Sequence, residues 1–111
     1  EVDALLDDLQ REGLLSDSRY AEALGHSRAG RHGSLRLKAD LRDKGVGEGD
    51  AAVAMAEARA NDLATARAVW AKKFDVPPTN AGERAKQMRF LAGRGFPLDV
   101  IRRVIGGIEE D

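Results

Sequence analysis

The side chains that could perform catalysis are few, and their spacing does not bring them together. The sequence has no Cys and two His, His26 and His32, which are six residues apart rather than the four that would place both imidazoles on one helix face. It contains neither a Gly-x-Ser-x-Gly elbow nor a Gly-x-x-x-x-Gly-Lys-Ser/Thr phosphate loop. We therefore expect no enzyme, no catalytic residue, no metal and no cofactor, and we interpret both His as surface or loop residues.

Charged side chains are more informative, because a formal net charge of −1 conceals an uneven distribution. Residues 1–24 carry seven acids and two bases, residues 25–45 carry six bases and two acids, and residues 67–103 carry nine bases and three acids. A surface polarised in this way favours a charged partner, either a nucleic acid or a charged protein surface. Ordinary solvated helix faces are the alternative interpretation.

The basic run over residues 28–44 is the stronger candidate for a binding site. Ser34 is predicted to cap a helix there and to leave free backbone N–H groups in a positive field, a combination that suits phosphate or an acidic protein groove. The run has no Phe, Tyr or Trp, which disfavours a platform for stacked bases. The predicted partner- or DNA-binding residues, including two from the second basic block, are Arg28, Arg31, His32, Arg36, Lys38, Lys44, Arg89 and Arg94.

A repeated phrase indicates how the elements that carry these residues end. LQREGL at 9–14, LRDKGV at 41–46 and LAGRGF at 91–96 each place Gly four residues after Leu and just before an apolar residue. Gly adopts the left-handed conformation of a helix C-terminus without a steric penalty, and the residue after it packs back on the helix. We predict three helix ends of this kind, with positive φ at Gly45 and Gly95.

Hydrophobic periodicity and an Ala-rich composition predict an all-α protein. Capping residues are expected at Ser16 or Asp17, at Ser34, at Asn61 or Asp62, and at Thr79 or Asn80. The predicted helices cover residues 2–12, 18–30, 35–44, 49–59, 62–74, 81–93 and 97–108.

The helix ends divide the chain into tandem three-helix repeats, stacked in an elongated, curved array. Residues 1–15 are expected to be the last helix of an incomplete N-terminal repeat, residues 16–60 the second repeat and residues 61–111 the third. No apolar run is long enough to cross a membrane, and the absence of Cys is typical of a reducing compartment. We expect a cytoplasmic monomer without membrane contact.

Two stretches, SDSRYAEAL and GSLRLKADLRDKGV, resemble the RecX regulators of bacterial recombinase, and ARAVWAKKF and MRFLAGRGF resemble later segments of that family in the same order. The family pattern appears as Leu15-Ser-Asp17-Ser-Arg19-Tyr20-Ala21 and as Arg36-Leu37-x-x-Asp40-Leu41-x-x-Lys44-Gly45-Val46. The family turn Gly-x-Gly-Pro is replaced by Arg31-His32-Gly33-Ser34, so the start of the following helix is expected to differ. The family also has helices upstream of the first one here.

The resemblance implies a regulator of homologous recombination and the SOS response. It implies binding along the groove of the filament of RecA and single-stranded DNA, with weaker binding to double-stranded DNA as a further expectation. There the protein would inhibit RecA ATP hydrolysis, strand exchange and coprotease activity without catalysis of its own. Two alternatives stay open: a helix-turn-helix-like DNA-binding module with residues 35–44 in the major groove, and a purely structural helical scaffold. The outward residues of that helix lack the Asn or Gln that reads adenine.

Overall fold

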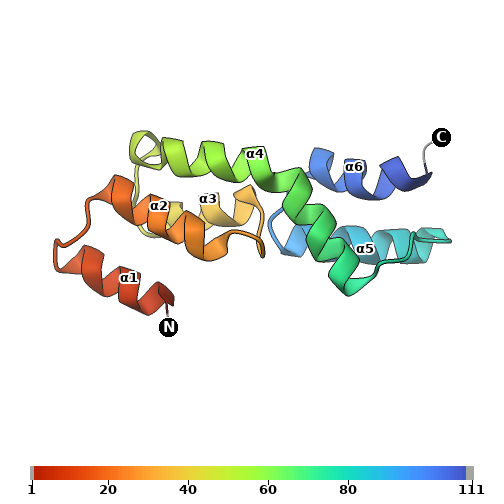
Figure 1. Ribbon diagram of the computed structural model, residues 1–111, viewed down its shortest axis with the longest axis horizontal. Helices are drawn as coiled ribbons and strands as arrows, with labels where there is room; N and C mark the ends of the chain where they lie inside the picture. Colours follow the sequence, from red (N-terminus) through yellow and green to blue (C-terminus); the bar gives the residue numbers. More distant parts are fainter. Residues whose placement is uncertain (1, 110–111) are drawn as a thin grey trace.

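Six helices and short connections make up the computed structural model, which describes residues 2–109 (Figure 1). Within that range there is no strand, so the all-α prediction is confirmed. None of the helices in the described part of the chain is both long and apolar enough to cross a membrane. The helices are α1 (Val2–Arg11), α2 (Asp17–Arg28), α3 (Ser34–Asp43), α4 (Glu48–Lys73), α5 (Ala81–Gly93) and α6 (Leu98–Glu109).

Side-chain caps start two of these helices as predicted. The hydroxyl of Ser16 accepts a hydrogen bond from the Arg19 N–H at 3.3 Å and caps α2. The side chain of Asn80 accepts from the Glu83 N–H at 2.8 Å, and the Glu83 carboxylate accepts from the Thr79 N–H at 2.9 Å. Each cap satisfies backbone donors that have no partner inside the helix.

The three repeated helix ends are confirmed. Gly13, Gly45 and Gly95 have φ of 77°, 78° and 91°. The residue after each Gly donates its N–H to the carbonyl of the Leu that opens the phrase, over 2.8, 3.0 and 3.3 Å, which is the Schellman pattern. Val46 and Phe96 also bury their side chains beside these helix ends, whereas Leu14 is 60% exposed and caps only through its backbone.

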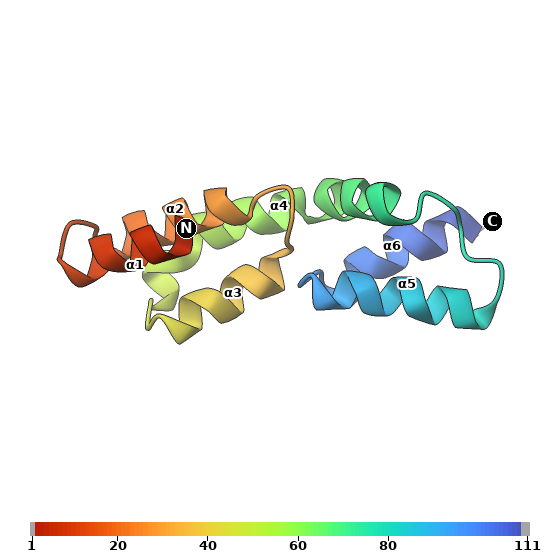
Figure 2. The same ribbon diagram turned by 90° about the horizontal axis from the view of Figure 1, so that it is seen from below.

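The predicted break between residues 59 and 62 is wrong, because α4 runs for 26 residues without interruption. The amide of Asn61 donates to the Glu57 carbonyl within the helix, and Asp62 is 3% exposed, so neither residue caps a new helix. The Ala-rich flanks are strong helix formers and carry the helix through this point. Figures 1 and 2 show that α4 changes direction near its middle instead of stopping.

Two separate hydrophobic cores lie along α4, which packs against α2, α3, α5 and α6. Figure 2 shows α3 beneath one half of α4 and the pair α5 and α6 beneath the other half. The Cα trace measures 51 × 25 × 18 Å, so the tandem arrangement is elongated as predicted. The first core contains Leu6, Tyr20, Ala21, Leu24, Leu37, Leu41, Val46, Ala51, Ala54 and Met55. The second contains Ala66, Leu91, Phe96, Val100, Ile101, Val104 and Ile105.

The two groups of helices also touch where α3 begins and α5 ends, a contact that we call the junction (residues 31–36, residue 62 and residues 94–96). The N–H of Gly33 donates to the Arg94 carbonyl and the N–H of Leu35 donates to the Gly95 carbonyl, both over 2.9 Å. A Cβ atom at Gly95 would lie 2.4 Å from the Cβ of Arg36. The backbones meet this closely because two glycines face each other across the contact.

The glycine pair Gly45 and Gly95 provides a test of the junction. Both have positive φ, so replacement by Ala costs about 1 kcal/mol at either position. Nothing lies within 4 Å of a Cβ at Gly45, whereas a Cβ at Gly95 collides with Arg36. We predict that Gly45→Ala lowers the free energy of unfolding by about 1 kcal/mol and Gly95→Ala by roughly 3 kcal/mol or more. Urea denaturation of both variants measures the difference, and equal losses would contradict the close backbone contact.

Candidate partner-binding surface at the junction

The start of α3 is capped from a distance by Asp62 of α4. Gly33, not Ser34, is the N-cap residue, and a glycine has no side-chain oxygen that could accept a hydrogen bond from the helix start. Ser34 instead donates its N–H to Oδ1 of Asp62 at 2.9 Å and its hydroxyl to Oδ2 at 2.5 Å. The next two N–H groups, of Leu35 and Arg36, donate to the carbonyls of Gly95 and Gly33. The predicted free N–H groups for an external anion are therefore wrong, because the protein occupies them itself.

The Asp62 carboxylate is buried between the two groups of helices. Burial raises its pKa above the ordinary value of 3.8, and the charge of Asp99 acts in the same direction. The two hydrogen bonds from Ser34 and the charge of Arg59 lower the pKa and offset part of this effect. The α3 N-terminus also favours a negative charge here. An internal carboxylate thus takes the place that a bound phosphate would take at a free helix start.

Three arginines and one histidine lie on the segments that form the junction; we call Arg31, His32, Arg36 and Arg94 the junction patch. Arg31 is exposed and its guanidinium donates to the Ser27 carbonyl. Arg94 donates to the Arg31 carbonyl at 3.3 Å, and its guanidinium carbon lies 5.1 Å from the centre of the Phe90 ring. These contacts hold the cations in place on a rigid backbone.

The imidazole of His32 lies among these positive charges. Burial lowers its pKa from the ordinary value of 6.5, and the charges of Arg36, Arg28, Arg94 and Arg31 lower it further. Its Nδ1 atom is buried and has no hydrogen-bond partner among the described residues. The side chain is therefore neutral near pH 7, and the positive potential of the patch comes from the arginines. Guanidinium groups bind carboxylate and phosphate through paired N–H donors, which suits a polyanionic partner.

Two of the predicted binding residues bind inside the protein instead. Arg28 has a side chain that is 15% exposed, and it forms ion pairs of 2.8 Å with both Asp3 and Asp40. Lys44 forms an ion pair of 2.6 Å with Asp7. Arg28 and Lys44 hold α1 against α2 and α3, so they are not free for a partner in this conformation. Lys38 and Arg89 are exposed but lie outside the junction.

The carboxylates that pair with Arg28 and Lys44 belong to a hydrogen-bonded network that was not predicted from the sequence. The Tyr20 hydroxyl donates to Asp7 at 2.9 Å, and burial together with this bond raises the pKa of Tyr20. The bonds from Lys44 and Tyr20 lower the pKa of Asp7. The signal was the acidic block over residues 1–24 directly before the basic block over residues 25–45. Opposite blocks on consecutive helices can pair with each other rather than with a partner.

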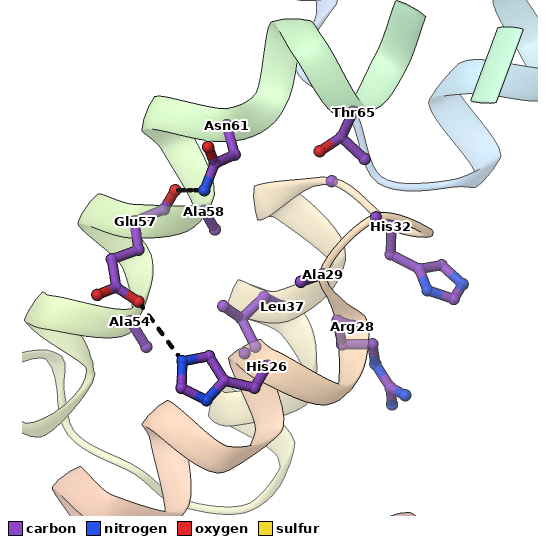
Figure 3. Close-up of a pocket in the computed structure, with 13 residues that line it drawn as sticks. His26, Arg28, Ala29, His32, Leu37, Ala54, Glu57, Ala58, Asn61 and Thr65 are labelled. Carbon is purple, nitrogen blue, oxygen red and sulfur yellow. Dashed lines mark hydrogen bonds and ion pairs between the residues drawn. The ribbon is translucent and has the colours of Figure 1, made fainter. Parts of the chain in front are cut away.

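A pocket of about 160 Å³ lies between the end of α2, α3 and α4, and both histidines contribute to its lining (Figure 3). His26 lies 4.0 Å from Glu57, and both side chains are more than half exposed. Figure 3 shows that His32 and Arg28 point away from this pair, so the two imidazoles do not converge. No group of three potential metal ligands occurs in residues 2–109 as described.

Comparisons with known proteins identify relatives over nearly the whole chain. Family models described as the RecX second and third three-helix domains match residues 16–55 and 60–105. The chain is 43% identical over 110 residues to a protein named Regulatory protein RecX from Ralstonia pickettii, covering 99% of this chain and 69% of the relative. It is 41% identical to a protein of the same name from Pseudomonas syringae pv. tomato, covering 96% of this chain and 70% of the relative. No solved structure matches the chain.

The hydrogen bonds of Asp62 predict a graded response to substitution. Asp62→Ala would leave the buried N–H of Ser34 without an acceptor, which costs about 1–3 kcal/mol in the free energy of unfolding. Asp62→Asn can accept from the same N–H and donate to the Ser34 hydroxyl, so we expect a smaller loss. Urea denaturation at neutral pH compares the two variants. A loss from Asn as large as that from Ala would show that the charge, not the hydrogen bonds, stabilises the junction.

The raised pKa of Asp62 predicts a pH dependence of stability. Between 3.8 and the raised value, the folded protein keeps a proton that the unfolded chain has released, so stability falls as pH rises through this window. Asn at this position does not titrate. We therefore expect the free energy of unfolding of the wild type, relative to Asp62→Asn, to increase as pH is lowered from neutral towards 3.8. A difference that is independent of pH would contradict the raised pKa.

Substitutions of Arg28 and Arg31 compare an arginine that is paired inside the protein with one that is exposed. Arg28→Met removes the cation that Asp3 and Asp40 share and leaves Asp40 with a longer ion pair of 3.7 Å to Arg36, and we predict a loss of about 1–3 kcal/mol in the free energy of unfolding. Arg31→Met removes an exposed charge and should change stability by less than about 0.5 kcal/mol. Thermal or urea unfolding gives both values. Similar values for the two variants would show that the Arg28 clamp does not stabilise the packing of α1.

Proposed function

The chain belongs to the RecX family of regulatory proteins, and on this basis we propose that it regulates bacterial recombination and the SOS response by binding the RecA–single-stranded DNA filament. The proposed binding site is the filament groove. The proposed consequence is inhibition of RecA ATP hydrolysis, strand exchange and coprotease activity. The protein acts without a catalytic step and as a monomer.

The observation that carries the proposal is the position and rigidity of the junction patch. Arg31 and Arg36 are exposed and Arg94 is half-buried at the contact between two groups of helices, in a molecule that is 51 Å long. Their backbones are fixed by hydrogen bonds between residues 33–35 and residues 94–95 and by the Asp62 cap. Guanidinium groups carried on a fixed backbone can match a polyanion, either the DNA backbone or acidic residues of RecA, and fixing the backbone in advance reduces the cost in conformational entropy.

We propose that inhibition follows from occupancy. An elongated protein in a helical groove contacts more than one filament subunit, and linked weak contacts bind more tightly than any one of them alone. Such binding would hold the filament in one state and hinder the movements that accompany ATP hydrolysis. The proposed repeat division is residues 1–15, 16–60 and 61–111, with the last boundary inside α4, so that the final helix of one repeat continues as the first helix of the next.

A helix-turn-helix mode of DNA binding receives less support from the junction. A recognition helix contacts bases mainly through residues near its N-terminus. The N-terminus of α3 is covered by the loop at Gly95 and by Asp62, because Ser34 is 1% exposed and Gly33 packs against Phe96. Binding to single- or double-stranded DNA outside the filament is therefore proposed to be weak and independent of sequence.

Charge reversal in the junction patch tests the proposal. We predict that Arg31→Glu combined with Arg36→Glu weakens binding to RecA filaments about ten-fold or more, because repulsion replaces two attractive contacts. The matched control is Arg19→Glu combined with Arg103→Glu, which reverses two exposed charges outside the patch. The measurements are co-sedimentation with filaments and the rate of RecA ATP hydrolysis. Unfolding of both variants should match the wild type within about 0.5 kcal/mol per site.

Two outcomes would contradict this assignment. Equal inhibition by the patch variant and the wild type would exclude the junction patch as the binding surface. Inhibition lost equally in the patch variant and in the Arg19/Arg103 control would indicate an effect of net charge rather than of a site. A further control is naked single- and double-stranded DNA, to which the wild type should bind much more weakly than to the filament.

A further inference from the structure

A second surface, separate from the junction patch, lies between α3 and the first half of α4. It is a groove of about 530 Å³. Its apolar floor is formed by side chains of the first core that are less than 9% exposed, and charged residues stand along its rim. The floor residues are Leu41, Val46, Ala51 and Met55, and the charged rim residues are Lys38, Arg42, Glu48 and Arg59.

The first core has smaller side chains than the second at two groove positions, when the two groups of helices are aligned. The repeated helix ends at Gly45 and Gly95 align the two groups of helices with an offset of 50 residues. Under this alignment, Ala51 corresponds to Ile101 and Val46 to Phe96. Ile101 and Phe96 are 1% and 2% exposed and fill their core. The small side chains of Val46 and Ala51 therefore leave room for the groove where the second core has Phe96 and Ile101.

The rim of the groove is positively charged on both walls. Lys38 and Arg42 lie one turn apart on α3, and Arg59 lies on α4 across from them; all three are exposed. None of the three forms an ion pair with any other residue in the described range 2–109. Glu48 is the one acidic lining residue. This differs from Arg28 and Lys44, whose charges are neutralised internally.

We propose that this groove binds an acidic amphipathic helix of a protein partner. Its apolar side chains would cover Ala51 and Met55, and its carboxylates would pair with Lys38, Arg42 and Arg59. A short helix laid in an apolar groove is an established mode of peptide recognition. A nucleic acid fits this surface less well, because the groove residues include no aromatic side chain for base stacking. The proposal does not depend on the junction patch or on RecA.

The test uses the full chain and synthetic peptides of about 12 residues, roughly three helical turns. The probe peptide carries leucines at i and i+4 among aspartates and glutamates. One matched peptide replaces both leucines by alanine, and a second replaces the acids by glutamine. Titration is followed by backbone amide NMR shifts. We expect the probe to shift the signals of residues 38–59 more than those of the junction. We expect the affinity of both matched peptides to be at least about ten-fold lower than that of the probe.

Substitutions in the protein locate the site. Ala52→Leu adds an exposed side chain to the lining of the groove, whereas Ala56→Leu makes the same change on the same helix at an exposed position outside it. We expect Ala52→Leu to weaken peptide binding several-fold and Ala56→Leu to leave it unchanged. Lys38→Glu combined with Arg42→Glu should abolish binding, whereas the Arg19→Glu and Arg103→Glu double variant should retain it. All six substitutions are at exposed positions, so each of the four variants is expected to fold.

Several results would overturn the proposal. Binding of the leucine-free peptide as tight as that of the probe would mean that the groove recognises charge alone. Larger shifts in residues 38–59 with a single-stranded oligonucleotide than with the probe would make the groove a phosphate site. No shift with the probe at millimolar concentration would exclude an acidic helix as the ligand. Because these readouts use no RecA, they are independent of the filament experiments.

Discussion

The arrangement of the two cores depends on one buried carboxylate. Asp62 of α4 accepts both hydrogen bonds from Ser34 and thereby satisfies the first free donor of α3. A charge in this position is costly unless it is paired, and the helix start provides both hydrogen bonds and a favourable field. The bond therefore joins the middle of the longest helix to the start of a short one. The close backbone contact between Gly33 and Gly95 lies directly beside that connection.

Charge serves two purposes in this protein, and burial decides between them. Arg28 and Lys44 reach acidic residues of α1 and stabilise the stacking of an additional helix on the first core. Arg31 is only a few residues away in the chain, yet it remains exposed at the surface, and Arg36 stays exposed although it forms an ion pair of 3.7 Å with Asp40. The difference arises from the side of α2 and α3 on which each side chain lies, since α1 covers one side only. A block of like charges in the sequence therefore predicts too large a binding surface, unless the residues that pair with other residues of the same protein are left out.

The sequence predicted the helix ends better than the helix starts. Left-handed glycines and their hydrogen bonds are local features, and all three phrases appeared as expected. The start of α3 and the continuity of α4 were mispredicted for one reason. Ser34 and Asp62 were each interpreted as local caps, whereas they bond to each other across 28 residues. Long-range pairing of this kind has no periodic signal. The arginines of the patch were identified by composition, but the locations of Arg28 and Lys44 required the three-dimensional arrangement of α1.

Because α4 is continuous, the number of residues between its two halves sets the relative orientation of the two cores. A helix rises 1.5 Å and turns about 100° with each residue, so 26 residues extend about 39 Å along the path of the axis. Inserting or deleting one residue between the two halves would rotate one core against the other by roughly 100°, and Asp62 and Gly95 could no longer meet α3 together. A loop in this place would absorb such a change. The continuous helix instead fixes both the distance and the rotation between the two cores, so changes in length should be tolerated in the connection at residues 74–80 but not within α4 or in the connection that forms the junction.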